Sequence, residues 1–219
     1  MINLKEQEDL FILIGDQLKE KVECLLIGGS AMMYYGLKET TKDIDLVFLK
    51  EEQRNKVINI LLKIGYKKRE IKTLYKRMIN LPVLMEFKDS RIDLFLNKII
   101  SFNITNTVIE RIKKVYEYNN FIIKIVSQED IILMKCATER AGDRLDAKEL
   151  ISNSEIDWNT IITESIRQAE FRELLYPLSL YDFLKELKED LKADIPDEIL
   201  NKTEKIAENK LNEHSKSKN

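Results

Sequence analysis

The sequence has few of the residues from which metal clusters, disulfides and catalytic triads are built. Its 219 residues include two cysteines and one histidine, His214. A multi-histidine metal site, a Ser-His-Asp triad and a cysteine-based zinc site are therefore excluded by counting. Cys24 and Cys136 lie in apolar surroundings, so we interpret both as buried free thiols in a reducing compartment.

Glycine, proline and long hydrophobic runs are also scarce. Six glycines and three prolines exclude collagen-like and low-complexity architectures. The longest uncharged run, Cys24 to Leu37, has 14 residues and is interrupted by glycines, so it is too short and too broken to span a bilayer. The acidic start of the chain is not typical of a secretory signal. We therefore expect a cytoplasmic protein with no membrane segment.

Neither sign of charge dominates the sequence. There are 36 Lys and Arg residues against 38 Asp and Glu residues, which gives a net charge of −2. This balance excludes a globally basic coat for nucleic acid but leaves room for a local basic groove. The hydrophobic share of 44% is typical of a globular chain with a proper core.

The pattern of the sequence changes near residue 126. Before it, short apolar runs alternate with amphipathic helical stretches, which favours a mixed α/β domain over residues 1–126. After it only helical patterns occur, so we expect a helical domain over residues 127–200. Residues 201–219 are rich in Lys, Glu and Asn and predict a polar tail, either a frayed helix or disordered. The predicted fold class is α+β, a mixed sheet with flanking helices followed by a helical domain.

Two aspartates lie in the run DIDLVFL, which we predict to be a strand. Residues two apart in a strand face the same side, so Asp43 and Asp45 share a face that continues with Val47 and Leu49. Like charges side by side repel one another, so a counter-charge is expected. A divalent cation that prefers oxygen ligands, such as Mg²⁺, is the natural candidate.

A turn of sequence Gly28-Gly29-Ser30 follows an earlier apolar run. Glycines let the backbone approach a ligand, and a helix that starts directly behind them presents N–H groups to an anion. Ser30 can add a hydroxyl, and Thr41, on the same face as Asp43, is a further candidate. A phosphate-binding turn followed by a metal-binding strand indicates a metal–nucleotide site.

These residues resemble the signature of the DNA polymerase β-like nucleotidyltransferase superfamily. That signature is a hydrophobic residue, Gly, Gly or Ser, a spacer, and then Asp-hydrophobic-Asp. The resemblance implies a nucleotidyltransferase-like sheet with a third carboxylate on a later strand. Asp93, in the run RIDLFL, matches best, ahead of Glu86 and Asp89. The alternative for Asp93 is a hairpin residue that pairs with Arg91 or with a lysine.

The segment EDIILMKCATERAGDRLDAKEL resembles a narrower group, the abortive-infection AbiEii-type toxins and related uncharacterised nucleotidyltransferases. In that group a helical Lys and a later Asp complete the nucleotide site. The resemblance therefore implies nucleotide contacts from Lys135, Arg144 and Asp146, and a helical domain that completes the cleft. The alternatives are a Lys135 that snorkels from a packed helix, and a solvated, salt-bridged face that carries Arg140, Arg144 and Asp146.

The resemblance implies transfer of a nucleoside monophosphate from an NTP to a hydroxyl acceptor, with release of pyrophosphate. Two Mg²⁺ ions, or Mn²⁺ in their place, would be held by Asp43, Asp45 and Asp93, which are also the predicted catalytic residues. The predicted nucleotide-binding residues are Gly28, Gly29, Ser30, Thr41, Lys135, Arg144 and Asp146.

Three functions stay open at this point. The chain is a transferase that modifies RNA or protein, for example as the toxin of a toxin–antitoxin pair, or a transferase that modifies a small molecule. Alternatively, it is a binding module, an antitoxin or regulator with a cognate protein partner and weak or no catalysis. An RNA acceptor needs a basic groove. The densest basic stretch, whose alternative is a solvated loop, contains Lys67, Lys68, Arg69, Lys72, Lys76 and Arg77.

Overall fold

The computed structural model describes residues 1–69, 81–138 and 140–216, and the chain divides into two compact units. Unit 1 is Met1–Ile100 with Ile104–Ser127, and unit 2 is Ser101–Asn103 with Gln128–Asn219. Unit 1 contains a mixed sheet with flanking helices, and the described part of unit 2 is helical apart from the short strand β9 (Phe102–Asn103). This confirms the predicted α+β fold class.

Within the described residues, the sheet of unit 1 has seven strands in the order β10-β11-β2-β4-β7-β6-β5. Two neighbouring pairs are parallel, β11 with β2 and β4 with β7, and the other pairs are antiparallel. The strands are β2 (Val22–Ile27), β4 (Asp43–Phe48), β5 (Lys67–Arg69), β6 (Val83–Phe87), β7 (Ser90–Leu96), β10 (Lys114–Tyr118) and β11 (Phe121–Ile125).

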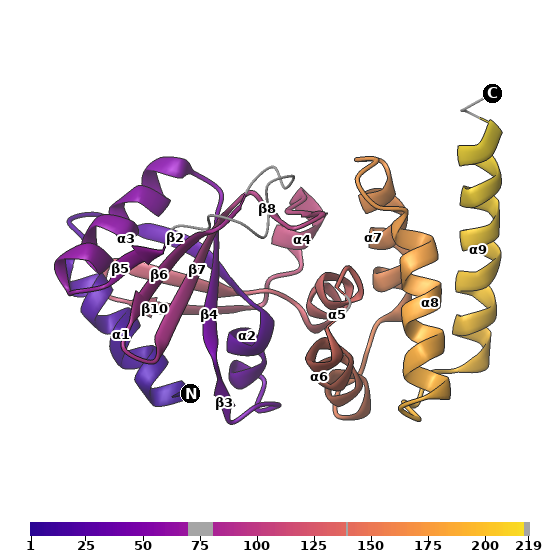
Figure 1. The fold of residues 1–219 in the computed structure, drawn as a ribbon, viewed down its shortest axis with the longest axis horizontal. Coiled ribbons are helices and arrows are strands. Elements are labelled where there is room, and N and C mark those ends of the chain that lie inside the picture. The colour runs from indigo at the N-terminus through magenta and orange to yellow at the C-terminus, as the bar shows by residue number, and fades with distance from the viewer. Residues whose placement is uncertain (70–80, 139, 217–219) are drawn as a thin grey trace. The chain divides into compact units, whose positions relative to one another are not determined.

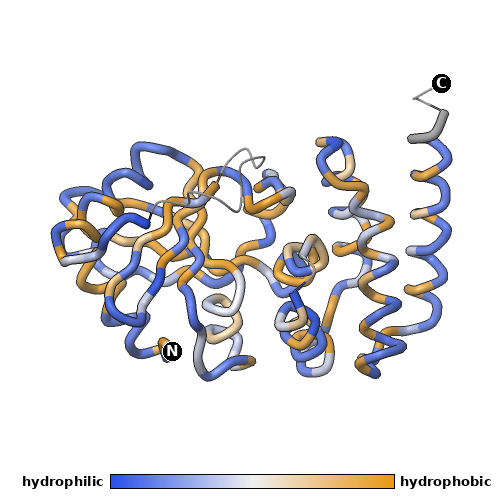
Figure 2. The backbone as a smooth tube through the Cα atoms, in the orientation of Figure 1, coloured by the Kyte–Doolittle hydropathy of each residue, from blue (hydrophilic) through white to orange (hydrophobic). Residues whose placement is uncertain are grey.

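One face of this sheet is apolar. Leu26, Leu46 and Leu94 lie side by side across β2, β4 and β7, and all three are fully buried. Helices α1 (Leu4–Gln17) and α3 (Glu51–Lys63) contact each other and the strands (Figure 1), and the Phe11 ring packs edge-on against Phe121 at 5.7 Å. Figure 2 shows hydrophobic residues concentrated along the strands of this unit. The other face of β4 and β7 carries polar groups at the start of both strands and becomes apolar further along, at Val47 and Phe95.

Short elements complete unit 1 and hold the chain just before β4. Strand β1 (Ile2–Asn3) pairs antiparallel with β3 (Thr40–Thr41), with Ile2 opposite Thr41. Asn3 then caps α1: its side chain accepts from the Glu6 N–H at 2.9 Å, and the Glu6 carboxylate accepts from the Asn3 N–H at 2.9 Å. The remaining elements are α2 (Gly28–Tyr34), α4 (Asn106–Glu110) and β8 (Lys98–Ile99).

A glycine lets α1 approach β10 closely. Gly15 is buried in α1, and a Cβ atom built there would lie 1.9 Å from the Tyr118 carbonyl oxygen. No side chain fits at that distance, so the contact between the helix and the sheet requires glycine although glycine lowers helix propensity.

Unit 2 is built from five helices in its described part. They are α5 (Gln128–Cys136), α6 (Ala141–Ser152), α7 (Trp158–Ala169), α8 (Tyr176–Glu189) and α9 (Asp197–Lys216). The Asp157 side chain caps α7 by accepting from the Asn159 and Thr160 N–H groups. Residues Asp130–Cys136 of α5 are all buried, which makes α5 the central helix of the unit.

Residues Ser101–Asn103 belong to unit 2, although sequence patterns assigned them to the α/β half. The Asn103 N–H donates to the Gln168 side-chain oxygen at 2.8 Å, and the Gln168 amide donates back to the Asn103 carbonyl at 2.8 Å. The Phe102 ring packs edge-on against Tyr176 at 6.0 Å. These contacts join residues far apart in the sequence, so no local pattern indicates them.

The predicted polar tail, residues 201–219, is helical in its described part, because α9 continues to Lys216. Ile199, Thr203 and Ala207 recur every four residues and are buried, so one helix face packs while the rest stays polar. Helices α8 and α9 lie side by side (Figure 1). The Tyr181 hydroxyl of α8 donates to Glu204 of α9 at 2.6 Å. None of the helices within the described residues, α9 included, combines the length and apolar character needed to cross a membrane.

We predict that Gly15→Ala destabilises the protein by about 2 kcal/mol, because overpacking against a carbonyl oxygen outweighs the gain in helix propensity. Chemical denaturation of the full chain measures the change. Gly142→Ala is the matched control: a Cβ atom at Gly142, in α6, meets no atom within 4 Å, so this variant should gain about 0.5 kcal/mol. Equal effects of the two substitutions would contradict the close approach of α1 to β10.

Candidate active site

The three predicted acidic residues meet on the polar face of β4 and β7. The two strands are parallel, and their register places Asp45 directly opposite Asp93 and Asp43 directly opposite Arg91. Partners opposite one another share a face, and residues two apart share it as well. Asp43, Asp45 and Asp93 therefore form one group of carboxylates, with Arg91 as the fourth corner.

Arg91 supplies the counter-charge of this group. Its Nε and Nη2 atoms donate to the two carboxylate oxygens of Asp93 at 2.8 and 2.7 Å, and its Nε lies 3.5 Å from Oδ1 of Asp43. Such a bidentate pair is among the strong hydrogen-bonded contacts of proteins. The hydrogen bonds that Arg91 donates to Asp93 raise the pKa of the Arg91 guanidinium, so this side chain remains positively charged.

The burial of the carboxylates is uneven. The Asp93 side chain is 8% exposed, whereas that of Asp43 is 29% exposed and that of Arg91 is 36% exposed. The nearly buried Asp93 carboxylate has both oxygens hydrogen-bonded to Arg91, as a buried polar group requires. The structure thus contains the Arg91 pairing that the sequence indicated as the alternative for Asp93. The metal-binding role of Asp93 stays a prediction.

The predicted glycine turn lies against the same carboxylates. Gly28 has φ = 63°, and a Cβ atom there would lie 2.7 Å from Oδ2 of Asp45. A Cβ atom at Gly29 would lie 2.9 Å from the Thr41 hydroxyl. Gly28 therefore needs glycine for its backbone angle. The missing side chains let Asp45 pack directly against Gly28, and Thr41 against Gly29.

Ser30 and Thr41 hold the start of β4. The Ser30 hydroxyl donates to the Asp43 carbonyl oxygen at 2.9 Å, and the Thr41 hydroxyl donates to the same oxygen at 3.1 Å. Both side chains are buried. In this structure the two hydroxyls position Asp43, and their predicted contacts to nucleotide stay predictions.

A hollow of about 270 Å³ opens beside the carboxylate group. Asp43 and Arg91 line it together with Lys42, Lys88 and Asp89. Asp43 can therefore be reached by solvent and small ions, although Asp93 is nearly buried.

The donor set fits a hard divalent cation. Asp43, Asp45 and Asp93 offer only carboxylate oxygens, which Mg²⁺ prefers. The guanidinium of Arg91, itself a cation, already contacts two of them. Across the described ranges of the chain, no three His, Cys, Asp or Glu side chains converge as a ready-formed metal site. Metal binding by all three carboxylates therefore requires side chains to move.

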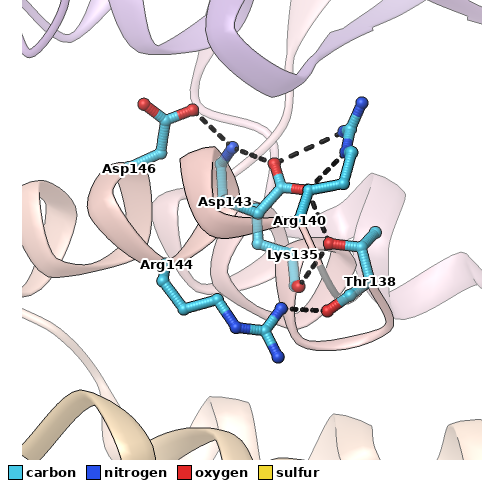
Figure 3. Close-up of polar contacts among 6 residues, drawn as sticks. All are labelled: Lys135, Thr138, Arg140, Asp143, Arg144 and Asp146. Carbon is cyan, nitrogen blue, oxygen red and sulfur yellow. Dashed lines mark hydrogen bonds and ion pairs between the residues drawn. The ribbon is translucent and has the colours of Figure 1, made fainter. Parts of the chain in front are cut away.

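The residues predicted in the helical half form a separate ionic cluster in unit 2 (Figure 3). The buried Lys135 ammonium donates to Asp143 at 3.0 Å and to Asp146 at 2.7 Å. Asp143 also accepts from the Thr138 hydroxyl at 2.5 Å and from Arg140 Nε at 2.8 Å. Figure 3 shows Lys135, Asp143 and Asp146 meeting between α5 and α6. Lys135 is thus held in a buried salt-bridge network, so it does not extend to the surface.

Arg144 points toward α8 from the same helix as Asp143. Its Nε lies 3.1 Å from both carboxylate oxygens of Glu186, its Nη1 donates to the Thr138 carbonyl, and its guanidinium lies 5.2 Å from the Phe183 ring centre. A second hollow, of about 200 Å³, is lined by Arg144, Phe183 and Glu186 among others. The predicted nucleotide contacts of Lys135, Arg144 and Asp146 stay predictions.

Sequence reasoning did not single out Asp143 or Glu186. Asp143 lies in the same short segment as the predicted residues, but its pairing with Lys135 crosses the break between α5 and α6. In the basic stretch, Lys67, Lys68 and Arg69 form the exposed edge strand β5. Lys72, Lys76 and Arg77 lie outside the described residues.

Comparison with known proteins points to one family. Residues 4–177 match the family model described as "Nucleotidyltransferase of unknown function (DUF6036)". One similar solved structure is described as a "putative nucleotidyltransferase from H. pylori", with 18% identity, coverage of 96% of this chain and 95% of the other, and a TM-score of 0.43. Another is an antigenic nucleotidyltransferase-like protein from Paracoccidioides brasiliensis, with 14% identity, coverage of 89% and 95%, and a TM-score of 0.43. No curated protein matches the chain.

We predict that Asp143→Asn destabilises the protein by about 2 kcal/mol at pH 7, because the buried Lys135 then keeps Asp146 as its remaining carboxylate partner. Burial acts to raise the pKa of Asp143, but the Lys135 charge and the hydrogen bonds from Thr138 and Arg140 outweigh it and lower the pKa. This stabilisation is present above the pKa of an unfolded Asp, about 3.9, and is lost as the pH falls through the folded value.

The difference in stability between wild type and Asp143→Asn should therefore shrink as the pH drops below about 4. Urea unfolding of the full chain at several pH values measures it. Asp194→Asn, at an exposed position of unit 2, is the control and should match wild type throughout. A constant difference between wild type and Asp143→Asn at all pH values would contradict the role of the Asp143 charge.

Proposed function

Because the chain belongs to the nucleotidyltransferase family DUF6036, we propose that the carboxylate group on β4 and β7 is its catalytic centre. Membership assigns the chain to the nucleotidyltransferase class of enzymes. The proposal specifies the reaction as transfer of a nucleoside monophosphate from an NTP to a hydroxyl acceptor. It also specifies dependence on Mg²⁺, with Mn²⁺ as an alternative ion.

One observation carries this assignment. Asp45 lies directly opposite Asp93, Asp43 lies two residues before Asp45 on the same strand face, and the Arg91 guanidinium contacts Asp93 and Asp43. Three carboxylates on one sheet face repel one another unless positive charge is bound among them. Their position beside the Gly28 turn suits a ligand that carries both metal and phosphate.

In the proposed reaction the acceptor hydroxyl oxygen forms a bond to the α-phosphorus of the NTP while the bond to pyrophosphate breaks. A divalent ion supplies charge stabilisation of the phosphates and acidification of the acceptor hydroxyl. Asp43, Asp45 and Asp93 would hold the ions and orient them. Ser30 and Thr41 contribute by holding the Asp43 carbonyl, which fixes the first of these carboxylates.

The phosphate chain of the NTP is assigned to the Gly28-Gly29 turn. The proposed donors to the phosphate oxygens are the backbone N–H groups of these two residues, which carry no side chains of their own. The proposal also includes nucleotide contacts from unit 2. There Arg144 lines a hollow, while Lys135 and Asp146 are joined in the buried cluster that supports α6.

The acceptor is proposed to be a hydroxyl group on RNA, on a protein or on a small molecule. The resemblance of the Lys135–Asp146 segment to AbiEii-type toxins favours a role in a toxin–antitoxin pair, with a cognate protein as partner. A second candidate is a binding module without catalysis, and one observation favours it. Arg91 satisfies both oxygens of Asp93, so the carboxylate group is neutralised in part without any metal.

We predict Mg²⁺-dependent binding of at least one of the four NTPs to the full chain. The variant Asp43→Asn/Asp45→Asn should weaken it by more than about 100-fold, since even outer partners of a metal site contribute about 10- to 100-fold to metal affinity. Isothermal titration calorimetry with each NTP, with and without Mg²⁺, measures the affinity.

Asp89→Asn is the matched control, because Asp89 is an exposed carboxylate on the turn that precedes β7 and lines the same hollow. It should bind NTP as wild type does. NTP binding that survives in Asp43→Asn/Asp45→Asn would contradict the assigned centre. Absence of NTP binding in wild type would favour the binding module.

A further inference from the structure

We propose that Arg91 is a positioning residue that occupies the cation site of the carboxylate group, and that a divalent ion displaces its guanidinium from Asp93 on binding. This inference rests on the proposed function, because it requires a metal at Asp43, Asp45 and Asp93. It adds that the Arg91 guanidinium and the metal ion compete for that site.

Arg91 occupies the carboxylate of Asp93. Both of its carboxylate oxygens accept hydrogen bonds from Arg91, at 2.8 and 2.7 Å. Its side chain is 8% exposed, so little of the carboxylate surface remains open. Arg91 takes up one lone pair of each oxygen. A metal ion ligated directly by Asp93 therefore competes with the guanidinium for the little carboxylate surface that remains open.

The positive charge of Arg91 serves two of the carboxylates. The same guanidinium lies 3.5 Å from Asp43, so Arg91 is shared between two of the three proposed ligands. A divalent cation placed among the carboxylates would repel a guanidinium that stays in contact with them. Two cations therefore compete for one cluster of negative charge, and the metal-free chain keeps the internal one.

The Arg91 side chain has space to move away from Asp93. The Arg91 side chain is 36% exposed and lines the hollow of about 270 Å³ beside Asp43. Glu86 lies opposite Arg91 on β6 and offers an alternative carboxylate in the same row. The guanidinium can thus leave Asp93 without being buried unpaired.

The chemistry of the pair explains why arginine suits this position. The planar guanidinium matches both oxygens of Asp93 at once, whereas a lysine ammonium is a point charge that cannot form the same fork. Arg91 therefore holds Asp93 in one orientation, ready for a metal, while the fold is free of metal.

The test uses Arg91→Gln and Arg91→Lys in the full chain, titrated with MgCl₂ alone by calorimetry and followed by thermal unfolding. Without metal, Arg91→Gln should lower the Tm by about 5 °C, because the carboxylates lose their counter-charge. Its Mg²⁺ affinity should rise at least about tenfold, the order expected from removing one unit charge beside a divalent ion. Arg91→Lys should fall between wild type and Arg91→Gln in both measurements.

Lys124→Gln is the matched control. Lys124 pairs with Glu23 at 2.5 Å in the same sheet, across β11 and β2, and contacts neither Arg91 nor Glu86. It should leave Mg²⁺ affinity unchanged. Equal Mg²⁺ affinity of wild type and Arg91→Gln, or an equal rise in Lys124→Gln, would overturn the inference while leaving the proposed metal site intact. Absence of Mg²⁺ binding in every variant would overturn both.

Discussion

The guanidinium of Arg91 lies between the carboxylates of Asp93 and Asp43, on the polar face of two parallel strands. The strands bring three acidic side chains together, and this guanidinium supplies the hydrogen bonds that the nearly buried Asp93 requires. Helix α3 contacts β4 and β7, and α1 contacts β10 and β11, which helps to fix the strand positions. The fold thus places like charges together, and Arg91 is the positive partner that this cluster requires.

The surrounding elements of unit 1 place further groups at this cluster. Strand β2 leads directly into α2, whose first residue, Gly28, lies against Asp45, and the hydroxyls of Ser30 and Thr41 both donate to the Asp43 carbonyl. Residues that lie far apart in the sequence are therefore gathered by three adjacent strands, β2, β4 and β7. Family membership assigns the nucleotidyltransferase class to this chain, and the gathered groups are where we propose that its chemistry occurs.

Much of this could be predicted from local patterns. Alternation in DIDLVFL indicated the shared face of Asp43 and Asp45, and the spacing from the glycine turn indicated the superfamily, which the family model confirms. The register that places Asp45 opposite Asp93 depends on long-range strand pairing, so sequence alone left two partners open for Asp93.

The Lys135 network could not be predicted from local patterns either. Its partner Asp143 lies beyond the break between α5 and α6, and the salt bridge between them is buried, which the spacing of the two residues does not indicate. The α9 helix forms because a few apolar contacts suffice when one face packs, which composition alone does not reveal.

The most direct test of the account is the position of a bound metal. Crystals of the full chain grown with Mn²⁺ and a non-hydrolysable NTP analogue allow the ion to be located by anomalous scattering. The account predicts an anomalous peak about 2.1 Å from carboxylate oxygens of Asp43, Asp45 and Asp93, with the Arg91 guanidinium withdrawn from Asp93. A bound nucleotide with its metal elsewhere, or with the Arg91–Asp93 pair intact beside it, would contradict the account.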